Sequence, residues 1–198
     1  MPSINLFKNS TVDDFSSILN NLGEPILIND TESIGVVATP TQSRTPSDDD
    51  RYITTKDKIS RGDVIKWRDR EWLILNEVVA AQKESYKSLM RHLAHTLNIQ
   101  IGMNQGEIIG YDSLGRPIYS DPEPIYAEIG VLAEAEKQVA GNGSIRLVDG
   151  NIKLIAPDNE QSRLVEVNHT YTIGNIEYRI YGIDPTETGL LLMYSEKK

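Results

Sequence analysis

Two histidines and a run of aspartates are the residues whose spacing best suits chemistry at a metal ion. His92 and His95 lie three positions apart, which places two imidazoles on one side of a helix but on opposite faces of a strand. Asp48, Asp49 and Asp50 are consecutive, whereas a calcium-binding loop alternates its ligands with other residues and closes with a glutamate. We therefore expect surface histidines and a solvated acidic loop, with no metal site and no cofactor.

The sequence lacks the common catalytic motifs. It contains no Gly-x-x-x-x-Gly-Lys phosphate loop, no Gly-x-Ser-x-Gly elbow and no His-Glu-x-x-His zinc motif. The absence of cysteine excludes disulfides, zinc–thiolate sites and cysteine nucleophiles. Asp13 and Asp14 suit the first turn of a helix, where carboxylates stabilise the positive helix end, better than an acid–base pair. We therefore expect a protein that is not an enzyme.

A cluster of basic residues around two tryptophans is the strongest candidate for a binding surface. Cationic and aromatic side chains intermingle there: Arg61, Lys66, Trp67, Arg68, Arg70 and Trp72. Aromatic rings among basic residues can stack the bases of single-stranded nucleic acid. We favour a second interpretation, in which the tryptophans belong to a core and the four cations face outward as a subunit interface, against acidic patches of a neighbouring subunit.

The elements that position these residues are predicted to be mainly β. A short helix is expected from Thr11 to Gly23, because apolar residues recur at helical spacing and glycine favours a helix end. Apolar and β-branched runs predict strands over residues 25–28, 34–39, 64–67 and 72–75. Two prolines and three aspartates predict a long, mobile loop from Thr39 to Asp50.

The middle of the chain is ambiguous. Residues 85–101 fit both the spacing of a helix and the alternation of a strand, so their periodicity leaves both open. Residues 102–124, which are rich in glycine and proline, predict a hairpin-rich hinge between two halves. Asn142-Gly143 and Asp149-Gly150 are hairpin-turn dipeptides in a second half that again has strand patterns.

The two halves align weakly with an offset of 106 residues, at which Trp72 falls on Tyr178. We therefore expect two domains. Residues 1–101 form a small β-barrel with a short N-terminal helix and a long loop over residues 39–55. Residues 102–198 form a second β-rich domain, which is a candidate divergent repeat of the first.

Composition narrows the class of protein. The chain has 198 residues, is 39% hydrophobic and carries a net charge of -9. A protein this acidic is poorly suited to wrapping a phosphate backbone with a broad basic face. The first residues lack the pattern of a secretion signal, and the apolar runs are too short to span a membrane. We expect a soluble, cytoplasmic product without a membrane partner.

A set of short motifs in the first half resembles a known family. The motifs are Asp13-Asp14-Phe15, Gly23-Glu24-Pro25-Ile26, Ile53-Thr54-Thr55, Ile59-x-x-Gly62-Asp63-x-Ile65, Trp72-Leu73-Ile74-x-x-Glu77 and Tyr86-x-x-x-Met90-Arg91. They resemble the head-closure, or stopper, proteins in the neck of tailed bacteriophages and prophages of Gram-positive hosts. The resemblance covers roughly residues 13–101, and the second half departs from the family pattern.

The resemblance implies a structural virion protein. It implies a β-barrel that forms a ring, commonly of six copies, between the portal or adaptor and the tail terminator or tail proteins. A barrel loop projects into the channel and helps to retain the packaged DNA without sequence specificity. The candidate channel loop here comprises Thr41, Gln42, Ser43, Arg44, Thr45, Ser47, Asp48, Asp49 and Asp50. Deleting residues 41–49 should leave folding intact but produce heads that leak DNA.

Two alternatives remain open at this stage. The first is another ring of the neck or tail, such as an adaptor, a tail terminator or a baseplate-hub component. The second is a β-barrel module that binds single-stranded nucleic acid through Trp67, Trp72 and the adjacent arginines. For the head-closure interpretation we expect a monomer or weak oligomer in solution, with the ring completed on the portal.

Overall fold

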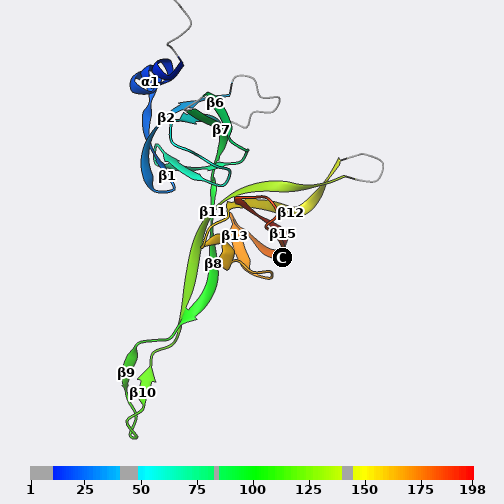
Figure 1. The fold of residues 1–198 in the computed structure, drawn as a ribbon. Helices are drawn as coiled ribbons and strands as arrows, with labels where there is room; N and C mark the ends of the chain where they lie inside the picture. The colour runs from blue at the N-terminus through cyan, green and yellow to red at the C-terminus, as the bar shows by residue number, and fades with distance from the viewer. Residues whose placement is uncertain (1–10, 41–48, 83–84, 140–144) are drawn as a thin grey trace, which may run out of the picture. The chain divides into compact units, whose positions relative to one another are not determined.

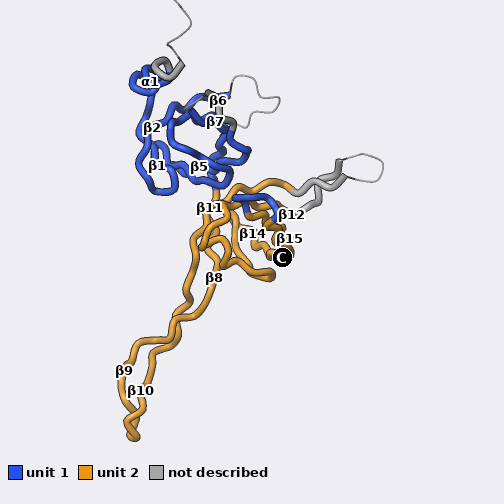
Figure 2. Tube along the Cα trace, in the orientation of Figure 1, with its two compact units in different colours: residues 1–94, 186–190 blue, residues 95–185, 191–198 orange. Residues whose placement is uncertain are grey.

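The computed structural model describes residues 11–40, 49–82, 85–139 and 145–198 (Figure 1). The chain divides into unit 1, with residues 1–94 and 186–190, and unit 2, with residues 95–185 and 191–198 (Figure 2). Strand accounts for 61% of the structure, so the predicted mainly β fold is confirmed. Among the described residues, no helix is long and apolar enough to cross a membrane.

Unit 1 is a closed six-stranded barrel preceded by a helix. Its elements are α1 (Thr11–Leu22), β1 (Glu24–Ile28), β2 (Thr31–Ala38), β3 (Asp50–Thr55), β4 (Val64–Trp67), β5 (Arg70–Ile74), β6 (Val79–Gln82) and β7 (Ser85–His92). The strands follow the order β3-β2-β1-β4-β5-β7-β6, and a further antiparallel pairing of β3 with β7 closes the ring. β6 pairs with β7 outside that ring.

Tight turns and strand alternation fix the register of this barrel. The hairpin turns Asn29-Asp30 and Arg68-Asp69 have positive φ at both central positions, as two-residue turns between twisted strands require. Alternate side chains then point inward and form one core, which consists of Ile26, Ile53, Ile59, Ile65, Trp72, Ile74 and Met90. Helix α1 ends before Gly23, whose N–H donates to the Leu19 carbonyl at 2.8 Å.

Unit 2 is a nearly closed six-stranded sheet that carries a separate two-stranded hairpin. Its elements are β8 (His95–Asn104), β9 (Ile108–Tyr111), β10 (Pro117–Tyr119), β11 (Glu123–Val139), β12 (Ile145–Pro157), the 3-10 helix η1 (Ser162–Leu164), β13 (Thr170–Ile173), β14 (Ile176–Asp184) and β15 (Leu190–Lys197). The sheet order is β13-β14-β15-β12-β11-β8. Its core includes the fully buried Leu97, Ile99, Val131, Leu154, Ile180 and Met193.

The two units have the same strand topology. The ring of unit 1 runs β1-β2-β3-β7-β5-β4, and the sheet of unit 2 runs β8-β11-β12-β15-β14-β13, so each strand has a counterpart. In the β4–β5 hairpin Ile65 pairs with Trp72, and in the β13–β14 hairpin Tyr171 pairs with Tyr178. These two pairs are related by the 106-residue offset seen in the sequence.

The loops that lead into these hairpins also correspond. The Gly62 N–H donates to the Ile74 carbonyl at 2.9 Å, and the Asn168 N–H donates to the Ile180 carbonyl at 2.8 Å. Gly62 and Asn168 both have positive φ. The same backbone device at the same offset supports a duplicated barrel.

The structure corrects three expectations about the middle of the chain. Residues 85–101 are strands, β7 and the start of β8, and the unit boundary lies after Ala94 rather than after residue 101. Residues 102–124 belong to unit 2 and are no hinge between the halves, since glycine and proline mark hairpin turns as readily as linkers. The predicted loop over residues 39–55 ends earlier, because Asp50–Thr55 form β3.

Candidate functional site

The outer surface of unit 1 has a groove of about 880 Å³ beside the β4–β5 hairpin. One row of side chains crosses it, because Glu32, Leu27, Lys66 and Glu71 are successive partners on β2, β1, β4 and β5. Carboxylates stand at both ends of this row. Leu27 and Lys66 lie between these carboxylates, so the groove combines an apolar contact with charged side chains.

The apolar part of the groove consists of Pro25, Ile26, Leu27, Ile34 and Trp67. Pro25 and Ile34 are cross-strand partners, and Ile34 is 51% exposed. Ile26 also lines the groove, although it is only 3% exposed and belongs to the core of the barrel. An exposed isoleucine beside a proline and a leucine is a surface suited to apolar contact.

Glu24, Trp67 and Arg68 form a compact cluster at one end of the groove. The Trp67 Nε1–H and the Arg68 Nε–H donate to Glu24 Oε2 at 2.8 and 2.9 Å, and Arg68 Nη2 donates to Oε1 at 2.8 Å. The Arg68 guanidinium also lies 4.6 Å from the centre of the Trp67 ring system. Hydrogen bonds from Arg68 and then from Trp67 hold the pKa of Glu24 below its ordinary value.

Lys66 is paired with one carboxylate in the β1–β2 turn and with another on β5. Its ammonium lies 2.7 Å from Asp30 Oδ1 and 3.6 Å from Glu71 Oε1. The hydrogen bond to Asp30 is the main cause that raises the pKa of Lys66. The side chain of Asp30 is 77% exposed and that of Glu71 is 48% exposed. Ion pairs this exposed contribute little to the stability of the fold, so their main effect is to position the lysine.

Arg61 and Arg70, the two remaining cations of the predicted interface, differ in whether they contact a carboxylate. The Arg61 guanidinium lies between Glu77 and Glu187, at 3.8 and 3.6 Å, and its Nε–H donates to the Thr188 carbonyl at 3.1 Å within unit 1. Arg70 is exposed and has no carboxylate partner among the residues that the structure describes. Of the four predicted interface cations, Arg70 is therefore the one available to a partner.

These contacts argue against the nucleic-acid interpretation of the basic cluster. Trp72 is 2% exposed and belongs to the barrel core, where it cannot stack on a base. Trp67 is partly buried, and its ring centre lies 5.7 Å from that of Trp72. The Arg68 guanidinium covers the Trp67 ring, at 4.6 Å from the ring centre. Three of the four cations already contact carboxylates, which lowers the positive potential that a phosphate backbone needs.

The predicted channel loop lies mostly outside the described residues. This holds for Thr41, Gln42, Ser43, Arg44, Thr45, Ser47 and Asp48. Asp49 is in a turn, and its carbonyl accepts a hydrogen bond from the His92 N–H at 3.1 Å. The sequence predicts Asp50 in the loop because it follows two other aspartates, and this prediction is wrong. Asp50 is the first residue of β3 and is buried against Arg91. The pairing of β3 with β7 is the physical reason for this correction.

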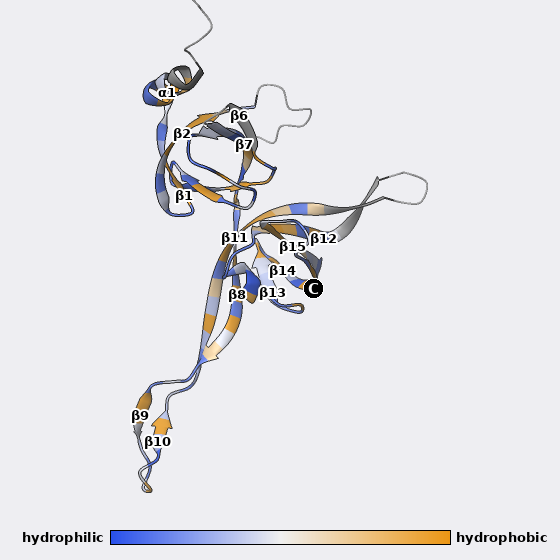
Figure 3. Cartoon of the chain, viewed as in Figure 1, coloured by the Kyte–Doolittle hydropathy of each residue, from blue (hydrophilic) through white to orange (hydrophobic). Residues whose placement is uncertain are grey.

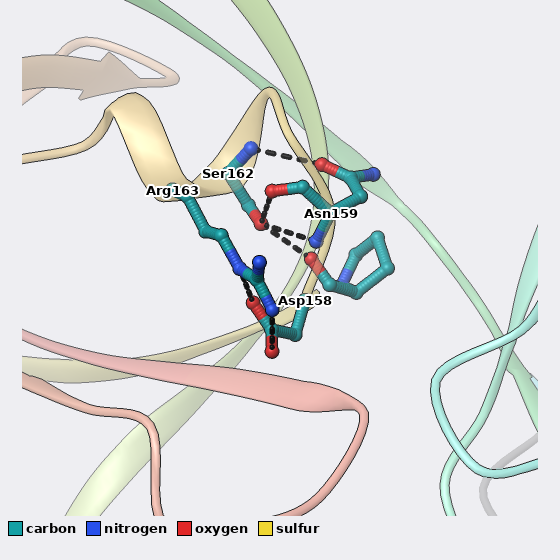
Figure 4. A network of polar contacts seen from close by, with 5 residues as sticks. Asp158, Asn159, Ser162 and Arg163 are labelled. Carbon is teal, nitrogen blue, oxygen red and sulfur yellow. Dashed lines mark hydrogen bonds and ion pairs between the residues drawn. The ribbon is translucent and has the colours of Figure 1, made fainter.

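Of the two histidines that suggested metal chemistry, His92 has a structural role. His92 packs on Trp72 with 5.4 Å between the ring centres. Within the described parts of the chain, no three His, Asp or Glu side chains gather as a metal site. The buried Ser162 resembles a nucleophile in type, but its hydroxyl donates to the Pro157 carbonyl at 2.6 Å (Figure 4).

The network around Ser162 fixes the turn that joins β12 to η1. Ser162 N–H donates to Asn159 Oδ1 at 2.9 Å, and the Asn159 N–H donates back to the Ser162 hydroxyl at 3.0 Å (Figure 4). Arg163 makes a two-point contact with Asp158, at 2.7 and 2.9 Å, and this hydrogen bonding lowers the pKa of Asp158. The network places Val165 in the core of unit 2.

A second surface feature was not recognised from the sequence. Residues 102–126, here named the arm, comprise β9, β10 and the adjoining parts of β8 and β11, and they extend away from the sheet of unit 2 (Figure 1). Figure 3 shows hydrophobic residues on β9 and β10. The arm holds nine of the sixteen exposed large hydrophobic residues in the described chain: Met103, Ile108, Ile109, Tyr111, Leu114, Ile118, Tyr119, Ile125 and Tyr126.

Comparisons with known proteins agree with the division into two units. The family model of the YomX N-terminal domain matches residues 4–92, and that of the YomX C-terminal domain matches residues 95–196. No curated protein matches the chain. Two structures of K. pneumonia MrkH, with c-di-GMP and in the apo state, cover 94% of this chain and 84% of their own, at 11% and 12% identity and a TM-score of 0.19. A similarity this weak carries no argument.

Proposed function

This chain belongs to the YomX family of Bacillus phage and prophage proteins, and on that basis we propose that it is a structural virion protein that forms the head-closure ring of the phage neck. In this proposal, copies of the chain form a ring between the portal or adaptor and the tail. The ring retains the packaged DNA by steric obstruction, without sequence specificity. The protein joins and blocks, and it catalyses no reaction.

The anchoring of the β2–β3 connection is the observation that supports this proposal most. Ala38 and Tyr52 are cross-strand partners, so the chain between Pro40 and Asp49 starts and ends at the same end of a closed barrel. Its return point is held by the buried pair of Asp50 with Arg91. Both ends of the connection are therefore held by barrel strands, as the proposal requires of a functional loop on a scaffold.

The charge of the chain is compatible with a wall around DNA. A net charge of -9 disfavours tight binding to phosphates, so DNA can pass such a ring when the tail is triggered. The cations of the β4–β5 hairpin are mostly held by carboxylates of unit 1 itself. Retention in this proposal therefore depends on the volume of the loop rather than on its affinity for DNA.

DNA retention after deletion of the loop tests this role. Deleting residues 41–48 keeps Asp49, Asp50 and every barrel strand, so unit 1 should fold and join the neck normally. Heads completed with the deletion variant should release DNA to added nuclease, whereas heads completed with the full chain should protect it. The matched control replaces residues 140–144, the topological counterpart in unit 2, with a glycine–serine linker of equal length, and DNA should stay protected.

Two results would contradict the proposal. Heads that contain the loop-deleted protein and still retain all their DNA would remove the role assigned to the loop. A protein that is incorporated only into tails would move the ring to a tail terminator or hub.

A further inference from the structure

The arm presents hydrophobic side chains on both of its faces. In the β9–β10 hairpin, Ile118 pairs with Gly110 and Tyr119 pairs with Ile108, with a shift of register between Ile118 and Tyr119. Because Ile118 and Tyr119 are consecutive on β10, their side chains point to opposite faces. On β9, Ile109 and Tyr111 are two further exposed hydrophobic side chains. Their exposed fractions are 68% and 67%, against 51% for Ile108. A hairpin that is apolar on both faces calls for burial between two surfaces.

The arm also lacks support from its own unit. Among the described residues, β9 pairs only with β10, and apart from the adjacent residues no described heavy atom lies within 4 Å of a Cβ placed on Gly110 or Gly115. An isolated two-stranded hairpin is marginally stable at best in water, and three or more strands are normally needed. Partner contacts are therefore expected to cover the arm in the assembled protein.

The charge of the arm favours a protein partner. The arm holds four acidic residues and one arginine, and that arginine, Arg116, is paired with Asp112 at 2.8 Å. No cationic partner faces Glu107, Asp121 or Glu123 among the described residues. A negative surface of this kind repels DNA and anionic lipid head groups. It favours an apolar protein surface that offers a cation.

We propose that the arm of one copy docks in the β4–β5 groove of a second copy of this chain. The groove provides the apolar contact through Pro25, Leu27 and Ile34, and its rim carries Arg70, the cation without a described carboxylate partner. The apolar residues of the arm cover Ile34 and its neighbours. One of the three free carboxylates of the arm pairs with Arg70.

The size of the arm is adequate for a specific contact. It comprises 25 residues, from 102 to 126, and a standard interface contributes roughly 20–30 residues from each partner. Because the arm belongs to unit 2 and the groove to unit 1, the contact is heterologous. A heterologous contact that repeats from copy to copy closes into a ring when the rotation allows it. The inference rests on these two surfaces and not on the position of the protein in the neck.

Disulfide trapping between copies tests the contact directly, because the natural chain has no cysteine. One preparation carries Ile109→Cys and a second, of different tag and mass, carries Ile34→Cys. After mixing and mild oxidation we expect a mixed disulfide dimer of the two. The matched control pairs Ile109→Cys with Ile176→Cys, which is 38% exposed on unit 2 outside the arm, and should give at least about tenfold less.

Two outcomes of the disulfide experiment would contradict docking of the arm on a second copy. Equal yields with Ile34→Cys and Ile176→Cys would overturn the proposal, because the disulfide would then reflect random collision. A chain that carries both Ile34→Cys and Ile109→Cys but closes only an internal disulfide would show that the arm docks on its own unit 1. Either result leaves the head-closure test unaffected, since that test measures DNA retention.

Sedimentation over a range of concentrations provides a second test. The variant Ile109→Asp/Leu114→Asp should associate with itself at least about tenfold more weakly than the natural chain, and Arg70→Glu should also weaken association. The control Leu164→Asp changes a residue of similar type, 48% exposed outside the arm, and should leave association unchanged. Equal weakening by all three variants would overturn the assignment of the arm.

Discussion

Asp50 and Arg91 form the ion pair at the seam where β3 meets β7, and alanine substitutions there test what holds the barrel of unit 1 closed. Arg91 Nε donates to Asp50 Oδ1 at 2.7 Å, and Nη2 donates to Oδ2 at 3.2 Å. The two residues are also cross-strand partners. The Asp50 side chain is 3% exposed and that of Arg91 is 26% exposed, so the two substitutions should differ in cost.

The expected magnitudes follow from this difference in exposure. Removing one partner of a buried pair costs about 3–5 kcal/mol of unfolding free energy. Arg91→Ala should fall within that range, because it leaves a buried carboxylate without its guanidinium. Asp50→Ala should cost only about 2 kcal/mol, because the remaining guanidinium still reaches water. The double variant Asp50→Leu/Arg91→Met removes both charges and should be less destabilised than Arg91→Ala.

Tryptophan fluorescence during urea unfolding measures these effects in unit 1 alone. The chain has two tryptophans, Trp67 and Trp72, and both lie in this unit. Trp72 packs on His92, the neighbour of Arg91 on β7, so its emission should report opening of the seam. The free energies are compared at an unchanged urea dependence.

The control for this experiment is Lys66→Ala. Its partner Asp30 is 77% exposed, and an exposed pair contributes less than about 1 kcal/mol. An Arg91→Ala variant no less stable than Lys66→Ala would refute the reasoning. So would a double variant as unstable as Arg91→Ala, since loss of the guanidinium beside the buried carboxylate would then not be the cause.

Three further predictions concern single positions. Ser162→Ala should lower the stability of unit 2 by about 1–3 kcal/mol, seen by circular dichroism, because it leaves buried backbone groups without their hydroxyl partner. Burial raises the pKa of Tyr171 to about 12, so the unfolded chain loses this proton first and stability should fall as pH rises from about 10 to about 12. In an absorbance titration of the folded protein, Tyr171→Phe should remove a tyrosine ionisation near pH 12. Gly62→Ala should destabilise unit 1 more than Gly115→Ala destabilises unit 2. Both positions have positive φ, but of the two only Gly62 would have its new Cβ clash with a backbone oxygen, that of Gly189.

Local patterns were sufficient to predict the hairpins but not the contacts that bring them together. The β4–β5 hairpin could be predicted because the Arg68-Asp69 turn separates two alternating runs. Residues 85–101 had two acceptable periodicities, and only the pairing of β7 with β3 and β5 makes them strands. Periodicity within one segment contains no information about such long-range partners.

The candidate site shows the same limitation. The sequence identified the cations of the β4–β5 hairpin, but their carboxylate partners Glu24, Asp30 and Glu187 are far away along the chain. Asp50 looked like the third member of an acidic loop, because nothing nearby indicates its pairing with Arg91. The arm was missed because Ile108, Ile109 and Tyr111 lie among glycines and prolines, which were interpreted as a hairpin-rich hinge between the halves.

Imaging the portal vertex tests the central claim most directly. Purified protein is added to tail-less, DNA-filled heads that carry the portal, and the vertex is reconstructed by electron microscopy. We predict a symmetric ring of added density below the portal into which the barrel of unit 1 fits, together with retained DNA. The assignment to the neck would be contradicted if the vertex showed no added density and the heads took up no protein, either before or after tails were added.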